Sequence, residues 1–360
     1  MSNIETTWKI YDVNETALEA MIADCKKATK SIVLEQLIFV TDNFGRRLID
    51  VCAERAKAGV KVRFLWDAWG SFSFFGSTII EDFKEKGIEL VFWKTIIPAY
   101  YKIPNFRSWF FRNHRRTLVI DEKIGYTGSM CVKDEMKNFH DTNIRIEGIA
   151  VGEMQNAFDR MWARALDQKP LPARIKTRDD EFRYIKNYPL PGRRHLYANL
   201  IEVIRHSRKY IYITTPYFVP TRRLARVLRL AAHRNVDVKI IMPEVSNHSF
   251  VDVAARTFFS SMLSSGVKIF LYQGKNIHGK TAVIDGDWAS VGSMNMDGIS
   301  LLYNFEANIV STNSKFAEEM VAHFVHDLQN AKEVTLKEWE KRSFLQKWLE
   351  FPARLVRKFL

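Results

Sequence analysis

Residues 278–285 read HGKTAVID and residues 292–295 read GSMN, and this stretch has a counterpart earlier in the chain. The counterpart is HRRTLVID at residues 114–121, followed by GSMC at residues 128–131. In both copies an aspartate follows the histidine by seven residues and a glycine follows it by fourteen. A further acidic residue comes later in each copy, in the segments 141–144 (DTNI) and 306–309 (EANI). Two segments in the same register indicate an internal duplication.

The segments around the motifs also repeat. Each half has a predicted strand, helix and strand in succession, at 31–39, 46–58 and 59–65 and at 210–218, 222–233 and 236–242. Further strands are predicted at 87–93 and 266–272. Strands joined through helices by short connections are typical of βαβ units, so we expect a largely parallel sheet in each half.

The predicted boundary between the halves is a proline-rich stretch. Residues 167–192 contain four of the ten prolines and show no hydrophobic periodicity, which is typical of a connection. We therefore predict an α/β fold of two pseudo-repeated sheet domains, at 1–166 and 193–334, with the site at their interface. The linker is 167–192, and residues 335–360 form a basic amphipathic tail.

The charge limits the class of partner. The 360 residues include 54 basic and 41 acidic side chains, a formal charge of +13. This excess favours a partner that carries phosphate, such as nucleic acid or anionic lipid. Three widely spaced cysteines fit neither a disulfide framework nor a zinc cluster. The sequence contains no run of 18 apolar residues, so no membrane-spanning helix is predicted. Residues 1–6 do not resemble a signal peptide.

The motif residues suit the chemistry of phosphate esters. Alternate residues of a strand share a face, so His278 and Lys280 are expected to point the same way, as are His114 and Arg116. A cation and neutral donors bind phosphate oxygens while an imidazole approaches phosphorus. The neutral donors predicted for this phosphate site are Ser129, Ser293 and Asn295.

The sequence resembles the phospholipase D superfamily, whose signature combines His-x-Lys, an aspartate and Gly-Ser-x-Asn in two copies. The second copy matches at His278, Lys280, Asp285, Gly292, Ser293 and Asn295. The first copy departs at Arg116 and Cys131, where the family has lysine and asparagine. The segments 215–220, 145–148 and 339–342 are most similar to bacterial cardiolipin synthases.

The resemblance implies a mechanism with a covalent phosphohistidine. One histidine attacks phosphorus, and the other protonates the departing alkoxide and then deprotonates the incoming alcohol or water. Family precedent makes His114 the nucleophile and His278 the acid, with no metal and no cofactor. Asp141 and Glu306 would each accept from a histidine Nδ1–H and select its tautomer. Asp121 and Asp285 belong to the catalytic motif but are expected to anchor a local loop.

The two departures leave an alternative open. Arg116 keeps the positive charge with a longer, planar group, whereas Cys131 is a weak donor. We expect an active enzyme, and the alternative is a protein that binds lipid without turnover.

Two segments predict contact with a lipid surface. Residues 94–113 contain four basic residues, six aromatic residues and no acidic residue, a combination that suits headgroups or the stacking of single-stranded nucleic acid. The tail has apolar residues at helical spacing and a basic excess, which suits a membrane interface.

The predicted function is a cardiolipin synthase-like transfer of a phosphatidyl group from phosphatidylglycerol to a second lipid alcohol. The protein would act as a monomer on the cytoplasmic face of the cell membrane, without an obligatory nucleic acid. Three alternatives stay open. They are a phospholipase D that releases phosphatidic acid, a nuclease of the same fold, and the non-catalytic lipid-binding protein.

Overall fold

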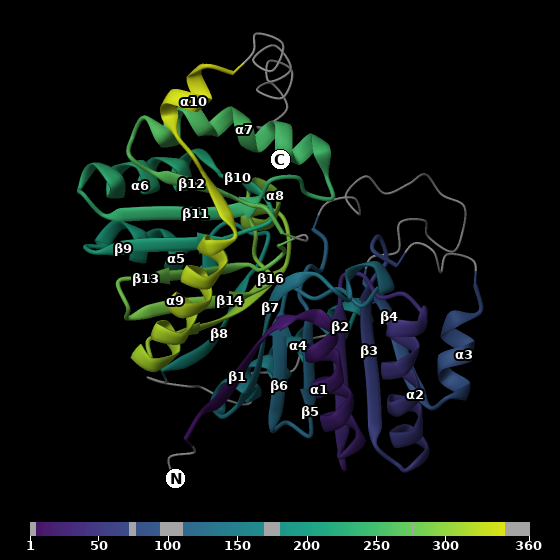
Figure 1. Ribbon diagram of the computed structural model, residues 1–360. Helices are drawn as coiled ribbons and strands as arrows, with labels where there is room; N and C mark the ends of the chain where they lie inside the picture. The colour runs from purple at the N-terminus through teal and green to yellow at the C-terminus, as the bar shows by residue number, and fades with distance from the viewer. Residues whose placement is uncertain (1–4, 72–76, 94–110, 169–180, 275–276, 343–360) are drawn as a thin grey trace.

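The computed structural model describes residues 5–71, 77–93, 111–168, 181–274 and 277–342, and these residues form two large sheets (Figure 1). The strands of the first sheet are β1 (Thr7–Val13), β2 (Ser31–Gln36), β3 (Lys61–Asp67), β4 (Ile88–Trp93), β5 (Thr117–Ile120), β6 (Ile124–Gly128) and β7 (His140–Glu147). The strands of the second sheet are β8 (Phe182–Asn187), β9 (Tyr210–Thr214), β11 (Asp237–Pro243), β12 (Lys268–Tyr272), β13 (Thr281–Ile284), β14 (Trp288–Gly292), β16 (Glu306–Ser311) and β17 (Ala331–Val334). A two-stranded sheet pairs β10 (Phe218–Val219) with β15 (Met296–Asp297).

Both large sheets have the same topology. The first runs β1-β7-β6-β5-β2-β3-β4, and the second, read in the same direction, runs β8-β16-β14-β13-β9-β11-β12 with β17 added at its edge. The duplicated motifs therefore lie on equivalent hairpins, β5–β6 and β13–β14. This agreement confirms the predicted duplication.

The sheets are mixed, so the prediction of largely parallel sheets was wrong. Parallel pairing joins β2, β3 and β4 in the first sheet and β9, β11 and β12 in the second. The motif strands pair antiparallel instead. The reason is the connection length, since three residues that join β5 to β6 allow a hairpin but no crossover.

The second repeat begins inside the stretch that we predicted as a linker. Strand β8 lies within 167–192 and pairs with β16, as β1 pairs with β7. Its side chains alternate only weakly between buried and partly buried positions, so the sequence carries little periodic signal there. Residues 169–180 of the predicted linker lie outside the described residues.

Helices cover the sheets on their outer faces and also lie between them (Figure 1). The first half contains α1 (Asn14–Lys26), α2 (Asn43–Lys57), α3 (Ile79–Glu85), a 3-10 turn (Asp134–Met136) and α4 (Ile149–Ala165). The second half contains α5 (His195–His206), α6 (Arg222–His233), α7 (Ser249–Leu263), α8 (Gly298–Leu302), α9 (Ser314–Gln329) and α10 (Leu336–Glu340). Each half has its own outer core, and a third core is shared.

The shared core joins the two halves. It combines Val119 and Phe158 of the first half with Val291 and Phe316 of the second. Burial of apolar surface contributes about 25 cal/mol per Å², so this core holds the two sheets against each other. The motif residues carried by the two halves are thereby kept in a constant spatial relation.

The aspartate that ends each motif holds a turn at the far end of its hairpin. Asp121 and Asp285 have left-handed φ angles of 54° and 58°, which a short polar side chain tolerates. The Asp121 carboxylate accepts from the backbone N–H groups of residues 29–31, and that of Asp285 accepts from those of residues 208–210. These are the contacts of a loop anchor. Seven residues of extended chain place each carboxylate roughly 20 Å from its histidine.

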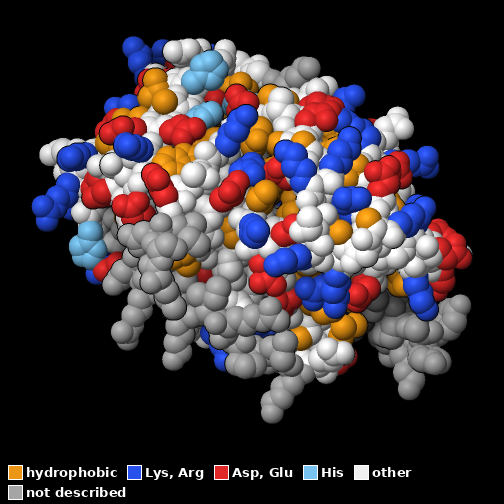
Figure 2. All heavy atoms as spheres, turned by 90° about the horizontal axis from the view of Figure 1, so that it is seen from below, with side chains coloured by type: hydrophobic (Ala, Val, Ile, Leu, Met, Phe, Trp, Pro, Cys, Tyr) orange, Lys and Arg blue, Asp and Glu red, His pale blue; other side chains and the backbone are white. Residues whose placement is uncertain are grey.

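The surface shows how the charge is distributed. On the face in Figure 2, basic side chains are interspersed with acidic ones. Such a face produces no strong field of one sign. In the part of the chain that the structure describes, no helix has both the length and the hydropathy needed to cross a membrane. Of the predicted tail, residues 343–360 lie outside the described residues.

Candidate active site

Each motif histidine is attached to a strand of the opposite half. The backbone N–H of His114 donates to the carbonyl of Phe305 at 3.0 Å, and that of His278 donates to the carbonyl of His140 at 2.7 Å. Phe305 and His140 lie directly before the two predicted carboxylates. Both histidines precede their motif strands, β5 and β13, in short extended segments. The interface between the halves therefore shapes both segments in the same way.

The carboxylates are exchanged between the halves. His114 Nδ1 lies 3.0 Å from Glu306 Oε2, and His278 Nδ1 lies 3.1 Å from Asp141 Oδ2. Both carboxylates are fully buried, and an ionised carboxylate only accepts. Each imidazole thus carries its proton on Nδ1 and keeps a lone pair on Nε2. This is the tautomer that a nucleophile or a general base requires.

The motif serines hold these carboxylates. Ser293 Oγ donates to Glu306 Oε2 at 2.5 Å, and Ser129 Oγ donates to Asp141 Oδ1. Both serines are completely buried. We predicted their hydroxyls as phosphate donors, and in this structure each hydroxyl donates to a carboxylate. A buried carboxylate needs hydrogen bonds to stay ionised, and here the adjacent serine hydroxyl donates one of them.

Each motif cation lies against its own histidine. Lys280 Nζ is 3.2 Å from His278 Nε2, and the Arg116 guanidinium is 3.3 Å from His114 Nε2. The side chains of each pair therefore point the same way, as the strand pattern predicted. The Arg116 guanidinium also donates to Cys131 Sγ at 3.4 Å. The two departures from the family signature are thus in contact with each other.

The remaining predicted donor, Asn295, lies close to this cluster. Its side chain is 4% exposed, and its Oδ1 has no hydrogen-bond partner among the described residues. Its backbone N–H donates to Ser300 Oγ at 3.0 Å. Ser300, which the sequence analysis did not single out, also donates to Glu306. Ser300 therefore links the Asn295 backbone to the second-half carboxylate, and the side-chain oxygen of Asn295 is a free acceptor among the described residues.

Burial sets the charges of the site. Burial and the neighbouring Lys280 lower the pKa of His278 to about 4, and burial and the Arg116 charge lower the pKa of Lys280 to about 7. Burial raises the pKa of Asp141, but its pairing with His278 outweighs this and brings it to about 2. Burial and Arg116 also lower the pKa of His114. Both imidazoles are therefore neutral at pH 7 in the free protein.

Two crowded cations suit an anion. In the described part of the chain, no carboxylate oxygen lies within 4.0 Å of Lys280 Nζ. A phosphate diester between Lys280 and Arg116 would relieve their repulsion and favour the charged form of the lysine. No group of three or more His, Cys, Asp and Glu side chains that suits a metal ion occurs among the described residues. The groups assembled here can bind a phosphate and offer two imidazole nitrogens to it.

The low pKa of His278 makes stability depend on pH. Between its folded value of about 4 and the ordinary value of 6.5, the unfolded chain binds a proton that the folded chain does not. The free energy of unfolding therefore falls as the pH is lowered through this window. We expect the thermal midpoint of the unmodified protein to fall more steeply between pH 6.5 and 4 than that of His278→Asn, as measured by circular dichroism. Parallel curves for the two proteins would contradict the burial of this imidazole.

A buried network behind His114 was not predicted from the sequence. Asp67 accepts from Arg112 Nε at 2.9 Å and from the backbone N–H of Asn113 at 2.8 Å. Asn113 Nδ2 donates to Glu35 Oε1 at 2.7 Å. Arg115 lies 3.9 Å from the Glu35 carboxylate. The only sequence signal was the position of these polar residues beside the motif and at a strand end. The neighbouring residues 94–110, predicted to meet lipid, lie outside the described residues.

Comparison with known proteins adds independent findings. The family described as cardiolipin synthase, PLD-like domain, matches residues 21–162 and 200–328. A cardiolipin synthase of Clostridium perfringens (strain SM101 / Type A) is 32% identical over 364 residues, which cover 96% of this chain and 75% of the relative. A cardiolipin synthase of Listeria welshimeri is 32% identical over 356 residues, with coverages of 95% and 73%.

Solved structures show the same fold. The crystal structure of phosphatidylserine synthase from Haemophilus influenzae Rd KW20 superposes with a TM-score of 0.76 at 13% identity. The superposition covers 98% of this chain and 92% of that one. A polyphosphate kinase from Porphyromonas gingivalis superposes with a TM-score of 0.64 at 12% identity, over 99% of this chain and 54% of that one. Both likenesses concern the fold alone.

Proposed function

Because the chain belongs to the cardiolipin synthase family with phospholipase D-like domains, we propose that it transfers a phosphatidyl group between alcohols in the manner of a cardiolipin synthase. The donor is phosphatidylglycerol, and the acceptor is the headgroup hydroxyl of a second phosphatidylglycerol. The observation that carries this proposal is the exchange of carboxylates, since His114 and His278 are each oriented by the opposite half. A single chain thus supplies two oriented imidazoles, which supports action as a monomer.

The reaction proceeds in two displacements. In the first, Nε2 of His114 attacks phosphorus while His278 protonates the glycerol oxygen that leaves. In the second, His278 takes the proton of the acceptor hydroxyl, the acceptor oxygen bonds to phosphorus, and the bond to His114 breaks. Both imidazoles are neutral in the free protein, so His278 must gain a proton when the substrate binds. The charge of the bound phosphate diester favours that protonation.

The remaining groups stabilise charge. Lys280 and Arg116 pair with the non-bridging phosphate oxygens, with the Asn295 amide beside them. Glu306 and Asp141 stabilise the imidazolium that forms at each step and keep the rings in place. Their own hydrogen bonds to Ser293 and Ser129 hold the carboxylates ionised. Cys131 touches Arg116 and stands where the family has an asparagine.

The direct test uses vesicles of labelled phosphatidylglycerol, with the lipid products separated by chromatography. Cardiolipin and glycerol are expected in equal amounts. Phosphatidic acid as the main product would instead identify a phospholipase D. Cleavage of single-stranded DNA without lipid turnover would identify a nuclease, and binding without any product would identify a lipid-binding protein.

The contact between Arg116 and Cys131 predicts coupling between these two positions. Arg116→Lys alone loses the contact with sulfur, and Cys131→Asn alone places an amide against an arginine. We expect Arg116→Lys/Cys131→Asn, which restores the family pair, to be at least about fivefold more active than the product of the two single effects predicts. Rates of cardiolipin formation measure this coupling. The control is a second double-mutant cycle, which combines Arg116→Lys with Cys52→Ala in the remote outer core. If the effects were additive in both cycles, the coupling would be refuted.

We also propose a peripheral location on the cytoplasmic face of the cell membrane. The support is the net charge of +13 and the basic, aromatic composition of residues 94–113. Sedimentation with vesicles is expected to show binding to anionic lipid that weakens as salt is added. Equal binding to zwitterionic vesicles at all salt concentrations would contradict this location.

A further inference from the structure

A hollow of about 560 Å³ lies on the His278 side of the cluster, between the segment after the 3-10 turn and the loop that follows β11. Its described walls include Asn138, Phe139, Ser246, Asn247, Tyr272 and Gln273. The mechanism described above uses none of these residues. The two segments come from opposite halves, so the hollow exists only in the assembled fold.

One wall of the hollow touches an active-site residue, and two further walls contact His140 and Tyr217, which lie outside the site. The Phe139 ring lies edge-on to the His278 imidazole, with ring centres 6.1 Å apart. The Tyr272 ring stacks on His140, whose carbonyl holds the backbone of His278. Asn247 Oδ1 accepts from the hydroxyl of Tyr217 at 2.5 Å.

The Tyr217 contact links the hollow to the first motif as well. Burial and the nearby Cys131 raise the pKa of Tyr217, and the charge of the nearby Arg116 acts in the opposite direction. Through the hydrogen bond to Tyr217, the Asn247 wall is therefore connected to the surroundings of the first motif. The Phe139 ring, which lines the hollow, is the wall that lies against His278.

The chemistry of the walls selects a class of ligand. Three side-chain amides and a serine hydroxyl face the hollow, together with the carboxylates of Glu135 and Glu244. Among the described residues that line it, none is a lysine or an arginine. Amides and carboxylates bind neutral hydroxyl groups well, whereas they repel or fail to neutralise a phosphate. The walls therefore suit a polyol rather than an anion.

We propose that this hollow binds the glycerol headgroup on the His278 side of phosphorus, first as the leaving alcohol and then as the acceptor. The inference rests on the proposed function and adds the location of the acceptor. With the headgroup held there, His278 Nε2 removes the proton of the terminal hydroxyl. The hydroxyl oxygen forms the new bond to phosphorus. The electron pair of the broken N–P bond returns to the His114 imidazole.

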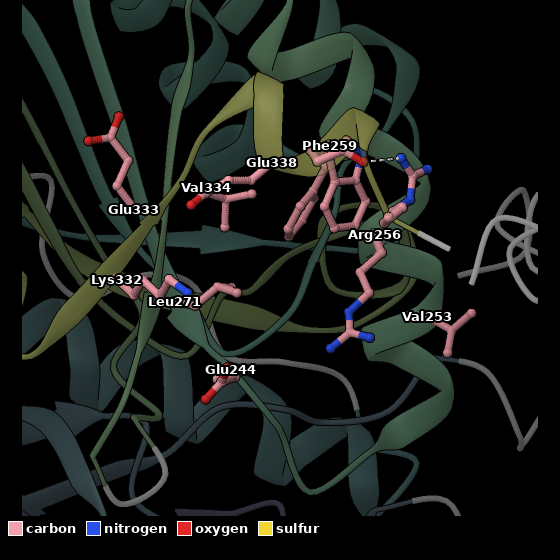
Figure 3. Close-up of a pocket in the computed structure, with 11 residues that line it drawn as sticks. Glu244, Val253, Arg256, Phe259, Leu271, Lys332, Glu333, Val334 and Glu338 are labelled. Atoms are coloured by element: carbon pink, nitrogen blue, oxygen red, sulfur yellow. Dashed lines mark hydrogen bonds between the residues drawn. The ribbon is translucent and has the colours of Figure 1, made fainter. Parts of the chain in front are cut away.

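A neighbouring hollow of about 490 Å³ suits the rest of an acceptor lipid. Glu244 lines both hollows, so the two are neighbours on the surface. Its walls include Phe259 and Leu271, and the Arg256 side chain extends from α7 on the side of the hollow where Glu244 lies (Figure 3). Trp339 of α10 packs on Phe259 with ring centres 4.8 Å apart. Besides its apolar side chains, this hollow is lined by three basic and three acidic residues, namely Arg256, Lys332, Arg342, Glu244, Glu333 and Glu338. The apolar part fits acyl chains and the cations fit a phosphate, so the preferred acceptor is a lipid rather than free glycerol.

The test measures how the covalent intermediate is partitioned. Cardiolipin and phosphatidic acid arise from the same intermediate, so their ratio does not depend on how fast it forms. Vesicles contain phosphatidylglycerol with labelled acyl chains, and the buffer contains isotopically labelled glycerol as a free acceptor. The three products are then cardiolipin, phosphatidylglycerol with labelled glycerol, and phosphatidic acid.

Asn138→Leu and Asn247→Leu are expected to lower both transfer products at least tenfold relative to phosphatidic acid. Arg256→Gln is expected to lower the ratio of cardiolipin to phosphatidic acid at least threefold and to leave the incorporation of labelled glycerol unchanged. Matched controls are Asn43→Leu, an exposed asparagine on α2, and Arg226→Gln on α6. Neither control should change the ratios.

Ratios within twofold of the unmodified protein in both asparagine variants would overturn the acceptor site. An unchanged cardiolipin ratio in Arg256→Gln would overturn the lipid site. Circular dichroism checks that each leucine variant folds. If one does not fold, Asn138→Ala is used in its place, because Asn138 is exposed and its truncation leaves the core unchanged. These outcomes differ from failure of the proposed function, in which the unmodified protein itself would form no cardiolipin.

Discussion

His278→Ala is expected to lower the rate of phosphatidyl transfer by at least about a thousandfold. The substitution removes the group that protonates the leaving glycerol and deprotonates the acceptor. It also leaves Asp141 buried without its partner at 3.1 Å. Binding to phosphatidylglycerol vesicles should be retained, because the remaining cations and the surface are unchanged. Product formation and vesicle sedimentation measure the two effects separately.

A donor with a nitrophenol leaving group makes this experiment more specific. Nitrophenolate leaves without a proton, so the first displacement no longer needs His278. The variant is then expected to release one equivalent of nitrophenolate and to accumulate phosphohistidine at residue 114, located by peptide mass analysis. His326→Ala, an exposed histidine on α9, is the control. Steady turnover by His278→Ala, or an adduct at another residue, would contradict the assigned order of the histidines.

Glu306→Gln is expected to lower the rate by about a thousandfold or more, although Glu306 is far from the first motif in sequence. The amide is nearly isosteric but can donate to His114 Nδ1, which would move the imidazole proton to Nε2. The nucleophilic lone pair would then point away from phosphorus. A comparable change of the acid in a serine protease triad costs about 10⁴ in rate.

A lower rate in Glu306→Gln could come from the wrong tautomer of His114 or from a less stable fold. The position of the proton on the His114 imidazole distinguishes the two explanations. Nitrogen-15 shifts of the imidazole are expected to report Nδ1–H in the unmodified protein and Nε2–H in Glu306→Gln. Glu318→Gln, an exposed carboxylate on α9, is the matched control and should leave the rate and the tautomer unchanged. Normal turnover in Glu306→Gln would show that this carboxylate does not select the tautomer.

Much of the fold was predictable because local patterns decide it. The helix predicted over 222–233 is α6, Arg222–His233, where Thr221 caps the first turn. The strand predicted over 87–93 is β4, Ile88–Trp93. The predictions failed where pairing depends on distant chain, as for β8, whose partner β16 lies more than one hundred residues later. A short strand at a sheet edge has too little periodicity to be recognised alone.

The roles of the site residues were only partly predictable, for a similar reason. The spacing of His278, Lys280 and Asn295 identifies groups that suit a phosphate. It does not show that Ser293 is turned toward a carboxylate, because that orientation depends on what else is buried nearby. Asp67 and Glu35 were missed because nothing in their own segments marks them as partners of residues 112–115.

By its sequence alone, the chain specifies a duplicated unit, two histidines with adjacent cations, and one acidic residue that follows each motif. Only the folded chain decides that Glu306 serves His114 across 192 residues and that Asp141 serves His278 across 137. Within each half the acidic residue is far closer along the chain, yet it contacts the histidine of the other half. The shared core packs β7 against β14 and β6 against β16. In this arrangement each buried carboxylate has the imidazole of the other half as its partner. Distance along the chain does not indicate which histidine each carboxylate contacts, because the packing of the two sheets determines that pairing.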